Sequence, residues 1–121
     1  MAKEPVLFIN SNYKPALEML QSHFTVFNYR DSTDRDALVA EAAKSVRAIF
    51  TNESSWVPSL MDSLPKLELI ALASNGYERL DLAKAKKHGI RITNTPEQTT
   101  GDVADLAVIL MLATARRVTW A

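Results

Sequence analysis

Short apolar runs alternate along this chain with stretches in which apolar residues recur every three or four positions. The runs are too short for helices and are typical of buried strands, whereas the stretches between them have the period of amphipathic helices. Strands are expected at residues 6–9, 24–29, 46–50, 67–72 and 90–92, and helices at 14–21, 35–44, 56–64, 80–88 and from 99 onward. The alternation predicts an α/β fold, a flavodoxin-like, doubly wound five-stranded parallel sheet with an additional long C-terminal helix.

Charged and hydroxyl side chains mark several helix ends. Asp34 closes a run of capping residues before the second helix, and Thr99 to Asp102 has capping-box spacing before the last one. His88 ends a basic stretch before Gly89, which predicts a capping role for this histidine at a helix C-terminus. In the first helix, Leu17, Leu20 and Gln21 are expected to face the sheet, and 67–72 is expected to be buried on both faces.

The last helix is apolar almost all round. From Val103 to Ala115 nearly every residue is hydrophobic, so both faces need cover. The run ends at Arg116-Arg117, well short of the ~20 residues that a membrane-spanning helix requires. We therefore expect no membrane association, a division into residues 1–98 and 99–121, and a homodimer, formed with or without exchange of this helix.

Composition excludes several classes of function. The 121 residues suit a single domain, and fourteen Lys plus Arg balance fourteen Asp plus Glu, which argues against a nucleic-acid partner. The absence of cysteine removes disulfides, thiolate metal sites and cysteine nucleophiles, and no structural metal is implied. Without a signal-peptide pattern at the N-terminus, the expected location is the cytoplasm.

Three loops should meet where ligands of open parallel sheets bind, beyond the carboxyl ends of the strands. They carry Asn52 after the third strand, Asn75-Gly76 after the fourth, and residues 93–100 after the fifth. A glycine amide can approach a ligand closely, and paired amides suit a carboxylate, which makes Asn75-Gly76 a candidate anion site. The alternative is a plain turn. The single aromatic residues Trp56, Tyr77 and Trp120 could face a ligand, although packing is the commoner role.

Several motifs in the same order resemble the substrate-binding half of the D-2-hydroxyacid dehydrogenases. The matching segments are Asn75-Gly76 followed by Asp81, Gly89-Ile90, Asn94-Thr95-Pro96, Val103-Ala104-Asp105 and Ala115-Arg116-Arg117. Among the subfamilies, the match is closest to glyoxylate and hydroxypyruvate reductases. Asn75-Gly76-Tyr77-Glu78 departs from the family's commoner Val-Gly-hydrophobic pattern, which leaves the particular 2-hydroxy acid open.

The resemblance implies that Asn75 and Gly76 hold the carboxylate of a small 2-keto or 2-hydroxy acid, and that Thr99, Thr100 and Val103 approach the nicotinamide of NAD or NADP. It implies no catalytic residue in this chain, because the family's arginine, acidic residue and histidine lie beyond the matched part. Only three glycines occur, so no G-x-G-x-x-G fingerprint can be written, and tight cofactor binding is not expected. The isolated chain is expected to be an inactive substrate-binding domain; the alternative is a stand-alone binding or assembly module that dimerises through its last helix.

Overall fold

The structure, a computed structural model, describes residues 3–9, 14–52, 55 and 57–118; Trp56 and Trp120 lie outside these residues. Strands and helices alternate strictly in the described chain, as predicted. In chain order they are β1 (Pro5–Ile9), α1 (Lys14–His23), β2 (Thr25–Asn28), α2 (Arg35–Ala42), β3 (Ala48–Thr51), α3 (Val57–Ser63), β4 (Leu69–Leu72), α4 (Leu82–Lys87), β5 (Arg91–Thr93) and α5 (Thr100–Ala115).

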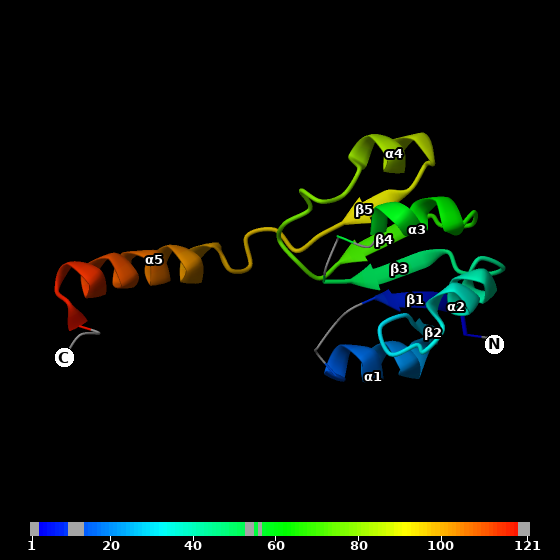
Figure 1. Cartoon of the computed structure of the whole chain (residues 1–121), viewed down its shortest axis with the longest axis horizontal. Coiled ribbons are helices and arrows are strands. Elements are labelled where there is room, and N and C mark those ends of the chain that lie inside the picture. The colour runs from blue at the N-terminus through cyan, green and yellow to red at the C-terminus, as the bar shows by residue number, and fades with distance from the viewer. Residues whose placement is uncertain (1–2, 10–13, 53–54, 56, 119–121) are drawn as a thin grey trace.

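The strands form one parallel sheet in the order β2-β1-β3-β4-β5. This order confirms the flavodoxin-like, doubly wound prediction, with β1 as the strand from which the chain winds both ways. Helices α1 to α4 lie around the sheet, whereas α5 extends away from it (Figure 1).

The two faces of the sheet are covered unequally. One face carries Leu7, Ile49 and Ile70 in register, all fully buried with side chains from α2, α3 and α4. On the opposite face the ring of Phe8 stacks on that of Phe50, with ring centroids 5.9 Å apart. Farther along that face, Ala48, Phe50, Leu69 and Ala71 are only half-buried.

Two burial predictions are therefore wrong in part. In β4, Ile70 and Leu72 are buried but Leu69 and Ala71 are only half-buried, and α5 extends away from the sheet and does not cover them (Figure 1). In α1, Leu17 and Leu20 are half-buried as expected, whereas Gln21 is exposed.

The predicted helix ends are correct at Asp34 and His88, and at Thr99 the position is correct but the predicted capping hydrogen bond is absent. Asp34 accepts a hydrogen bond from the Ala37 amide at 2.9 Å, and His88 is the C-cap residue of α4, with its amide donating to the Lys84 carbonyl at 3.0 Å. Thr99 occupies the N-cap position of α5, but its hydroxyl makes no capping hydrogen bond. Its backbone (φ −115°, ψ 4°) departs from the extended conformation in which a capping side chain reaches the first-turn amides.

Candidate substrate-binding loops

The loops after β3, β4 and β5 are joined by backbone hydrogen bonds. The amide of Ala73 donates to the carbonyl of Thr51 at 2.8 Å, which continues the β3–β4 pairing past the end of the strands. The amide of Thr95 donates to the carbonyl of Ser74 at 3.1 Å, which ties the segment after β5 to the loop after β4. Asn52 directly follows the fully buried Thr51 and is itself exposed. The structure thus brings Asn52 and the Asn75 loop to the same edge of the sheet, as the sequence predicted.

Side chains donate hydrogen bonds to the backbone carbonyls of the candidate anion loop. The amide nitrogen of Asn94 donates to the Asn75 carbonyl at 2.9 Å, and the hydroxyl of Ser74 donates to the Gly76 carbonyl at 3.1 Å. The Asn75 and Gly76 amides have no acceptor among the described residues. With its carbonyls held and its amides unpaired, this exposed loop offers donors, which is the polarity that a carboxylate needs.

Gly76 keeps open a space that a carboxylate oxygen can occupy. A Cβ built on Gly76 would lie 2.6 Å from Oε2 of Glu78, so the side chain of Glu78 already lies against the glycine. This contact is with the far end of a flexible side chain, and it places an acidic group beside the unpaired amides. The glycine therefore leaves room for a close approach at this point and is not needed for an unusual backbone conformation.

Asp81 fixes the helix that follows the loop. Its carboxylate accepts a hydrogen bond from the Lys84 amide at 2.8 Å as the N-cap of α4, and the Leu80 amide donates to the Tyr77 carbonyl at 2.9 Å. The side chain of Asp81 thus serves the helix start, and the tight turn before it returns the chain from the exposed Tyr77 to the buried Leu80.

An ion pair anchors α4 to α3. The ammonium of Lys84 donates to the carboxylate of Asp62 and, at 3.1 Å, to the Pro58 carbonyl. The hydrogen bond from Lys84 lowers the pKa of Asp62. Nε2 of His88 lies 3.9 Å from Asp62, so this histidine faces a structural carboxylate and not the loops.

The three residues matched to the cofactor lie at the base of α5. Thr99 precedes the helix, Thr100 begins it, and Val103 in its first turn is 62% exposed. The Thr95–Ser74 hydrogen bond brings the segment that leads to them alongside the Asn75 loop, but within the described chain no backbone hydrogen bond joins these three residues to that loop. No group of His, Asp or Glu side chains in the described chain is arranged to hold a metal ion, and no described helix is long and apolar enough to cross a membrane.

Asn94 is the functional candidate whose role the sequence did not reveal. It was visible only as part of a motif, and its contact with Asn75, nineteen residues earlier, depends on the pairing of β4 with β5. A signal was nevertheless present, because Asn94 follows the strand adjacent to the one that carries Asn75.

Comparison with known proteins identifies the family. The D-isomer specific 2-hydroxyacid dehydrogenase catalytic domain matches residues 6–119, and the chain belongs to this family. The hydroxyphenylpyruvate reductase of Plectranthus scutellarioides is 40% identical over 100 residues, which cover 82% of this chain and 32% of that protein. The glyoxylate reductase of Thermococcus onnurineus is 36% identical over 118 residues, 95% of this chain and 35% of that protein. This chain thus spans about a third of the length of these relatives.

Solved structures agree with this assignment. A 2-hydroxyacid dehydrogenase from Ketogulonicigenium vulgare superposes on the whole chain with a TM-score of 0.89 and 38% identity, and this chain covers 38% of it. An NADPH-dependent glyoxylate/hydroxypyruvate reductase from Sinorhizobium meliloti, solved with NADP and malonate, matches 93% of this chain with a TM-score of 0.70 and 29% identity; 34% of that chain is covered.

Proposed function

We propose that this chain is the substrate-binding domain of an NAD(P)-dependent D-2-hydroxyacid dehydrogenase of the glyoxylate/hydroxypyruvate reductase type. The ligand is a small 2-keto or 2-hydroxy acid, whose carboxylate accepts hydrogen bonds from the amides of Asn75 and Gly76, with Asn52 at the edge of the same site. The observation that carries the proposal is the loop whose carbonyls are bonded by Asn94 and Ser74 while its amides are unpaired.

The relatives support this choice of substrate class. Their names include glyoxylate, hydroxypyruvate and hydroxyphenylpyruvate reductases, and the first atoms of all three substrates are the same 2-keto carboxylate. The unpaired amides would bind this shared part. The substituent on the keto carbon differs among the substrates of the relatives, and Asn52 and Tyr77 are the candidate residues to contact it.

In this proposal residues 1–98 hold the acid and residues 99–121 lead toward a nucleotide-binding domain, with Thr99, Thr100 and Val103 near the nicotinamide. A bound NADH or NADPH would supply the hydride that converts the keto acid to a D-2-hydroxy acid. These 121 residues contain no glycine-rich cradle for a pyrophosphate, so their own contribution is to bind and orient the acid. We therefore propose that the isolated chain does not turn over, and that it acts in the cytoplasm.

The proposal is tested by titrating the ¹⁵N-labelled chain with oxalate, an unreactive dicarboxylate, and following its amide NMR spectrum. We expect saturable shifts at Asn75, Gly76 and Tyr77, with Gly101 as an internal reference that does not move. Absence of a saturable shift at millimolar oxalate would refute the binding role of the loop in this chain.

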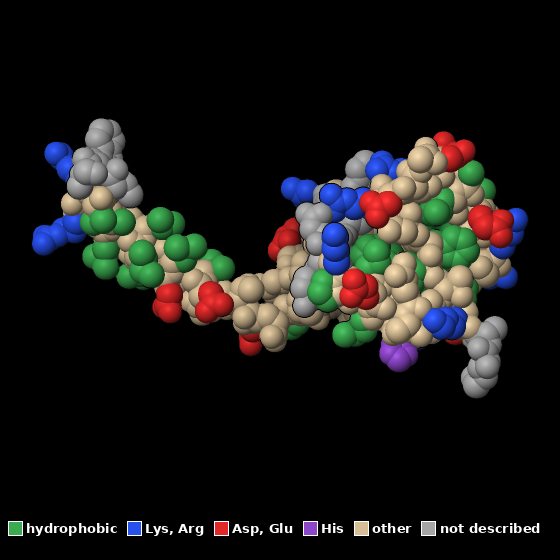
Figure 2. All heavy atoms as spheres, turned by 90° about the horizontal axis from the view of Figure 1, so that it is seen from below, with side chains coloured by type: hydrophobic (Ala, Val, Ile, Leu, Met, Phe, Trp, Pro, Cys, Tyr) green, Lys and Arg blue, Asp and Glu red, His purple; other side chains and the backbone are tan. Residues whose placement is uncertain are grey.

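A second candidate function, assembly, rests on a different observation. Hydrophobic side chains cover α5 in the space-filling view, and Leu110 and Leu112 are 57% and 60% exposed (Figure 2). Phe50 and Leu69 on the sheet are half-buried at the same time. We propose that two copies associate through α5, with each helix covering the other or the sheet face of the other copy, because exposed apolar surface costs about 25 cal/mol per Å².

Light scattering after gel filtration tests this assembly. We expect the mass of a dimer for the natural chain and the mass of a monomer for the double variant Leu110→Asp and Leu112→Asp. A monomer of the natural chain at high concentration, or an unchanged mass of the variant, would exclude assembly through α5. Neither result bears on the oxalate titration, because the substitutions lie outside the Asn75 loop.

A further inference from the structure

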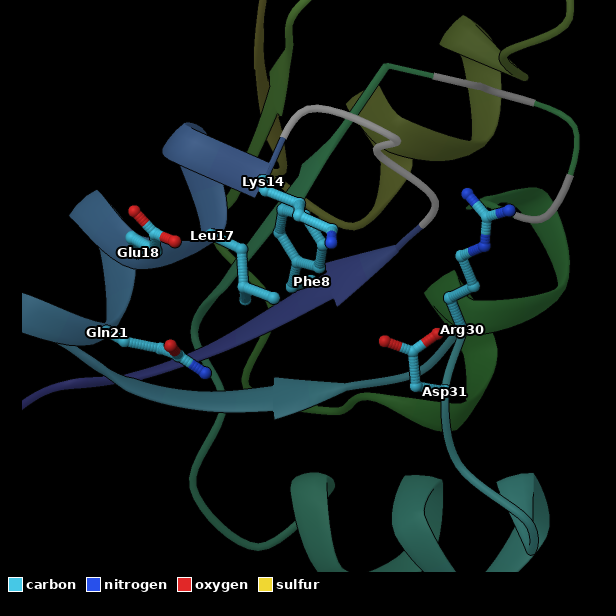
Figure 3. Close-up of a pocket in the computed structure, with 7 residues that line it drawn as sticks. All are labelled: Phe8, Lys14, Leu17, Glu18, Gln21, Arg30 and Asp31. Carbon is cyan, nitrogen blue, oxygen red and sulfur yellow. The ribbon is translucent and has the colours of Figure 1, made fainter.

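A second candidate binding site lies at the carboxyl ends of β1 and β2 (Figure 3). It is a hollow of about 410 Å³, within the range typical of small-molecule sites. Because β3 lies between β1 and β4, and adjacent strands are about 4.8 Å apart, the hollow is roughly 10 Å along the sheet from the Asn75 loop. The described residues that line it are Phe8, Lys14, Leu17, Glu18, Gln21, Arg30 and Asp31.

One stripe of α1 forms a wall of the hollow. Lys14, Leu17, Glu18 and Gln21 follow one another at helical spacing and share a face. Only Leu17 among them is apolar and half-buried; Lys14, Glu18 and Gln21 are exposed, so the helix presents a mainly polar stripe to the hollow. Lys14 is the first residue of α1, a position where the helix dipole disfavours a cation and favours an anion. A ligand carboxylate beside Lys14 would be stabilised by both the ammonium and the helix end.

The opposite wall holds a positioned carboxylate. Oδ2 of Asp31 accepts a hydrogen bond from the Asn28 side chain at 2.9 Å, and the Asp31 amide donates back to Asn28 at 3.3 Å. This reciprocal pair fixes the Asp31 side chain, and its other oxygen has no partner among the described residues. Lys14 and Asp31 approach the hollow from opposite sides, from α1 and from the segment after β2 (Figure 3).

The ligand that fits is dipolar and carries an apolar group. The described lining residues include two cations and two carboxylates, so their formal charge sums to zero and they do not select a simple anion. Among the described residues its accessible apolar part is Leu17, while the ring of Phe8, which also lines the hollow, is only 1% exposed and stacks on Phe50. A ligand with one positive end, one negative end and a hydrocarbon side group matches all three features.

We propose that this hollow binds a free amino acid with an apolar side chain. Lys14 binds its carboxylate, Asp31 and the side-chain oxygen of Gln21 accept hydrogen bonds from its ammonium, and its side chain lies against Leu17, at the point where the buried Phe8 reaches the hollow. This site is separate from the proposed substrate loop and does not depend on it.

The test is an amide NMR titration of the 121-residue chain with L-phenylalanine, alongside two analogues that each lack one charge, 3-phenylpropionate and phenethylamine. We expect saturable shifts at Phe8, Lys14 and Asp31 with the amino acid, about tenfold weaker binding of either analogue, and no shift at Gly76. Equal binding of the three compounds, or no saturable shift with L-phenylalanine, would overturn the proposal.

Matched variants test the two charged contacts. Lys14→Gln and Asp31→Asn should each weaken the binding of L-phenylalanine about tenfold, which corresponds to about 1.4 kcal/mol. The controls Lys86→Gln and Asp105→Asn change charge at exposed sites elsewhere and should leave it unchanged. If the four variants behave alike, the assignment is wrong. The oxalate response of Asn75 and Gly76 in each variant reports on the substrate loop separately, so failure of one site is distinguishable from failure of the other.

Discussion

Replacing Gly76 by alanine should separate ligand binding from folding in the substrate loop. The backbone of Gly76 is not in the left-handed region, so alanine can adopt it without strain. The added methyl would meet only the carboxyl end of the Glu78 side chain, with Oε2 at 2.6 Å, and that flexible end can move away. A glycine-to-alanine change at such a position typically stabilises a protein by about 0.4–1 kcal/mol through the unfolded state. We therefore expect the free energy of unfolding to change by less than about 1 kcal/mol.

Oxalate binding should respond much more strongly. In the structure an oxygen of the Glu78 carboxylate lies in the space beside Gly76, and we expect a ligand carboxylate to use the same space. The added methyl fills that space. Loss of one hydrogen bond to a charged group costs about 1.5–3 kcal/mol, which corresponds to a reduction in affinity of roughly tenfold to more than a hundredfold.

Two measurements check this reasoning, urea unfolding for stability and the amide NMR titration for oxalate affinity. The matched control is Gly101→Ala in α5, where a Cβ would meet nothing within 4 Å and the loop is untouched. If the Gly76→Ala variant binds oxalate as tightly as the unmodified chain, the placement of the carboxylate at this glycine is refuted. A large loss of stability would show instead that the loop has no room for a methyl group.

Further substitutions test the surroundings of the loop. Glu78→Gln should tighten oxalate binding about fivefold in the same titration, because a like charge at ~4 Å costs about 1 kcal/mol in water; weaker binding would contradict the repulsion. Asn94→Ala frees the Asn75 carbonyl and should weaken oxalate binding several-fold while the urea midpoint falls only slightly, and an unchanged affinity would show that the loop is held without it. Two hydrogen bonds from Arg47 lower the pKa of Glu68 below its ordinary value of 4.5. The pair therefore contributes to stability above about pH 4.5, and this contribution is lost as the pH falls through the lowered pKa. Glu68→Gln should therefore reduce the urea midpoint at pH 7 and leave it unchanged near pH 2, and an equal effect at both pH values would exclude the ion pair as the cause.

The strand and helix pattern was predictable because burial sets it. Runs such as the one ending at Leu72 must be buried at least on one side, and their alternation with helical periods leaves few topologies open. The edge of the sheet that carries Asn52 and Asn75 followed from the same rule. What could not be predicted depends on tertiary geometry: the Asn94 contact needs the β4–β5 pairing, and the missing side-chain cap at Thr99 depends on its own dihedral angles.

Burial on the second face of the sheet shows the same limit. The sequence correctly marks α5 as a helix in need of cover, but apolar composition does not say where the cover comes from. The half-buried Leu69 and Ala71 illustrate this: their face of the sheet is one place where such a helix could pack, and the sequence alone does not say whether it does.

The projection of α5 also bears on how the protein melts. None of its sixteen residues is buried, and an isolated helix of this length is marginal in water. In a monomer, the helical circular dichroism of α5 would fade gradually on heating, before the sheet is lost in one cooperative step. Amide hydrogens of α5 would exchange with solvent at a rate set by local opening, whereas those of β1 and β3 would exchange only through global unfolding. Amide exchange in α5 would therefore report partner binding, because its rate would fall when a partner covers the helix.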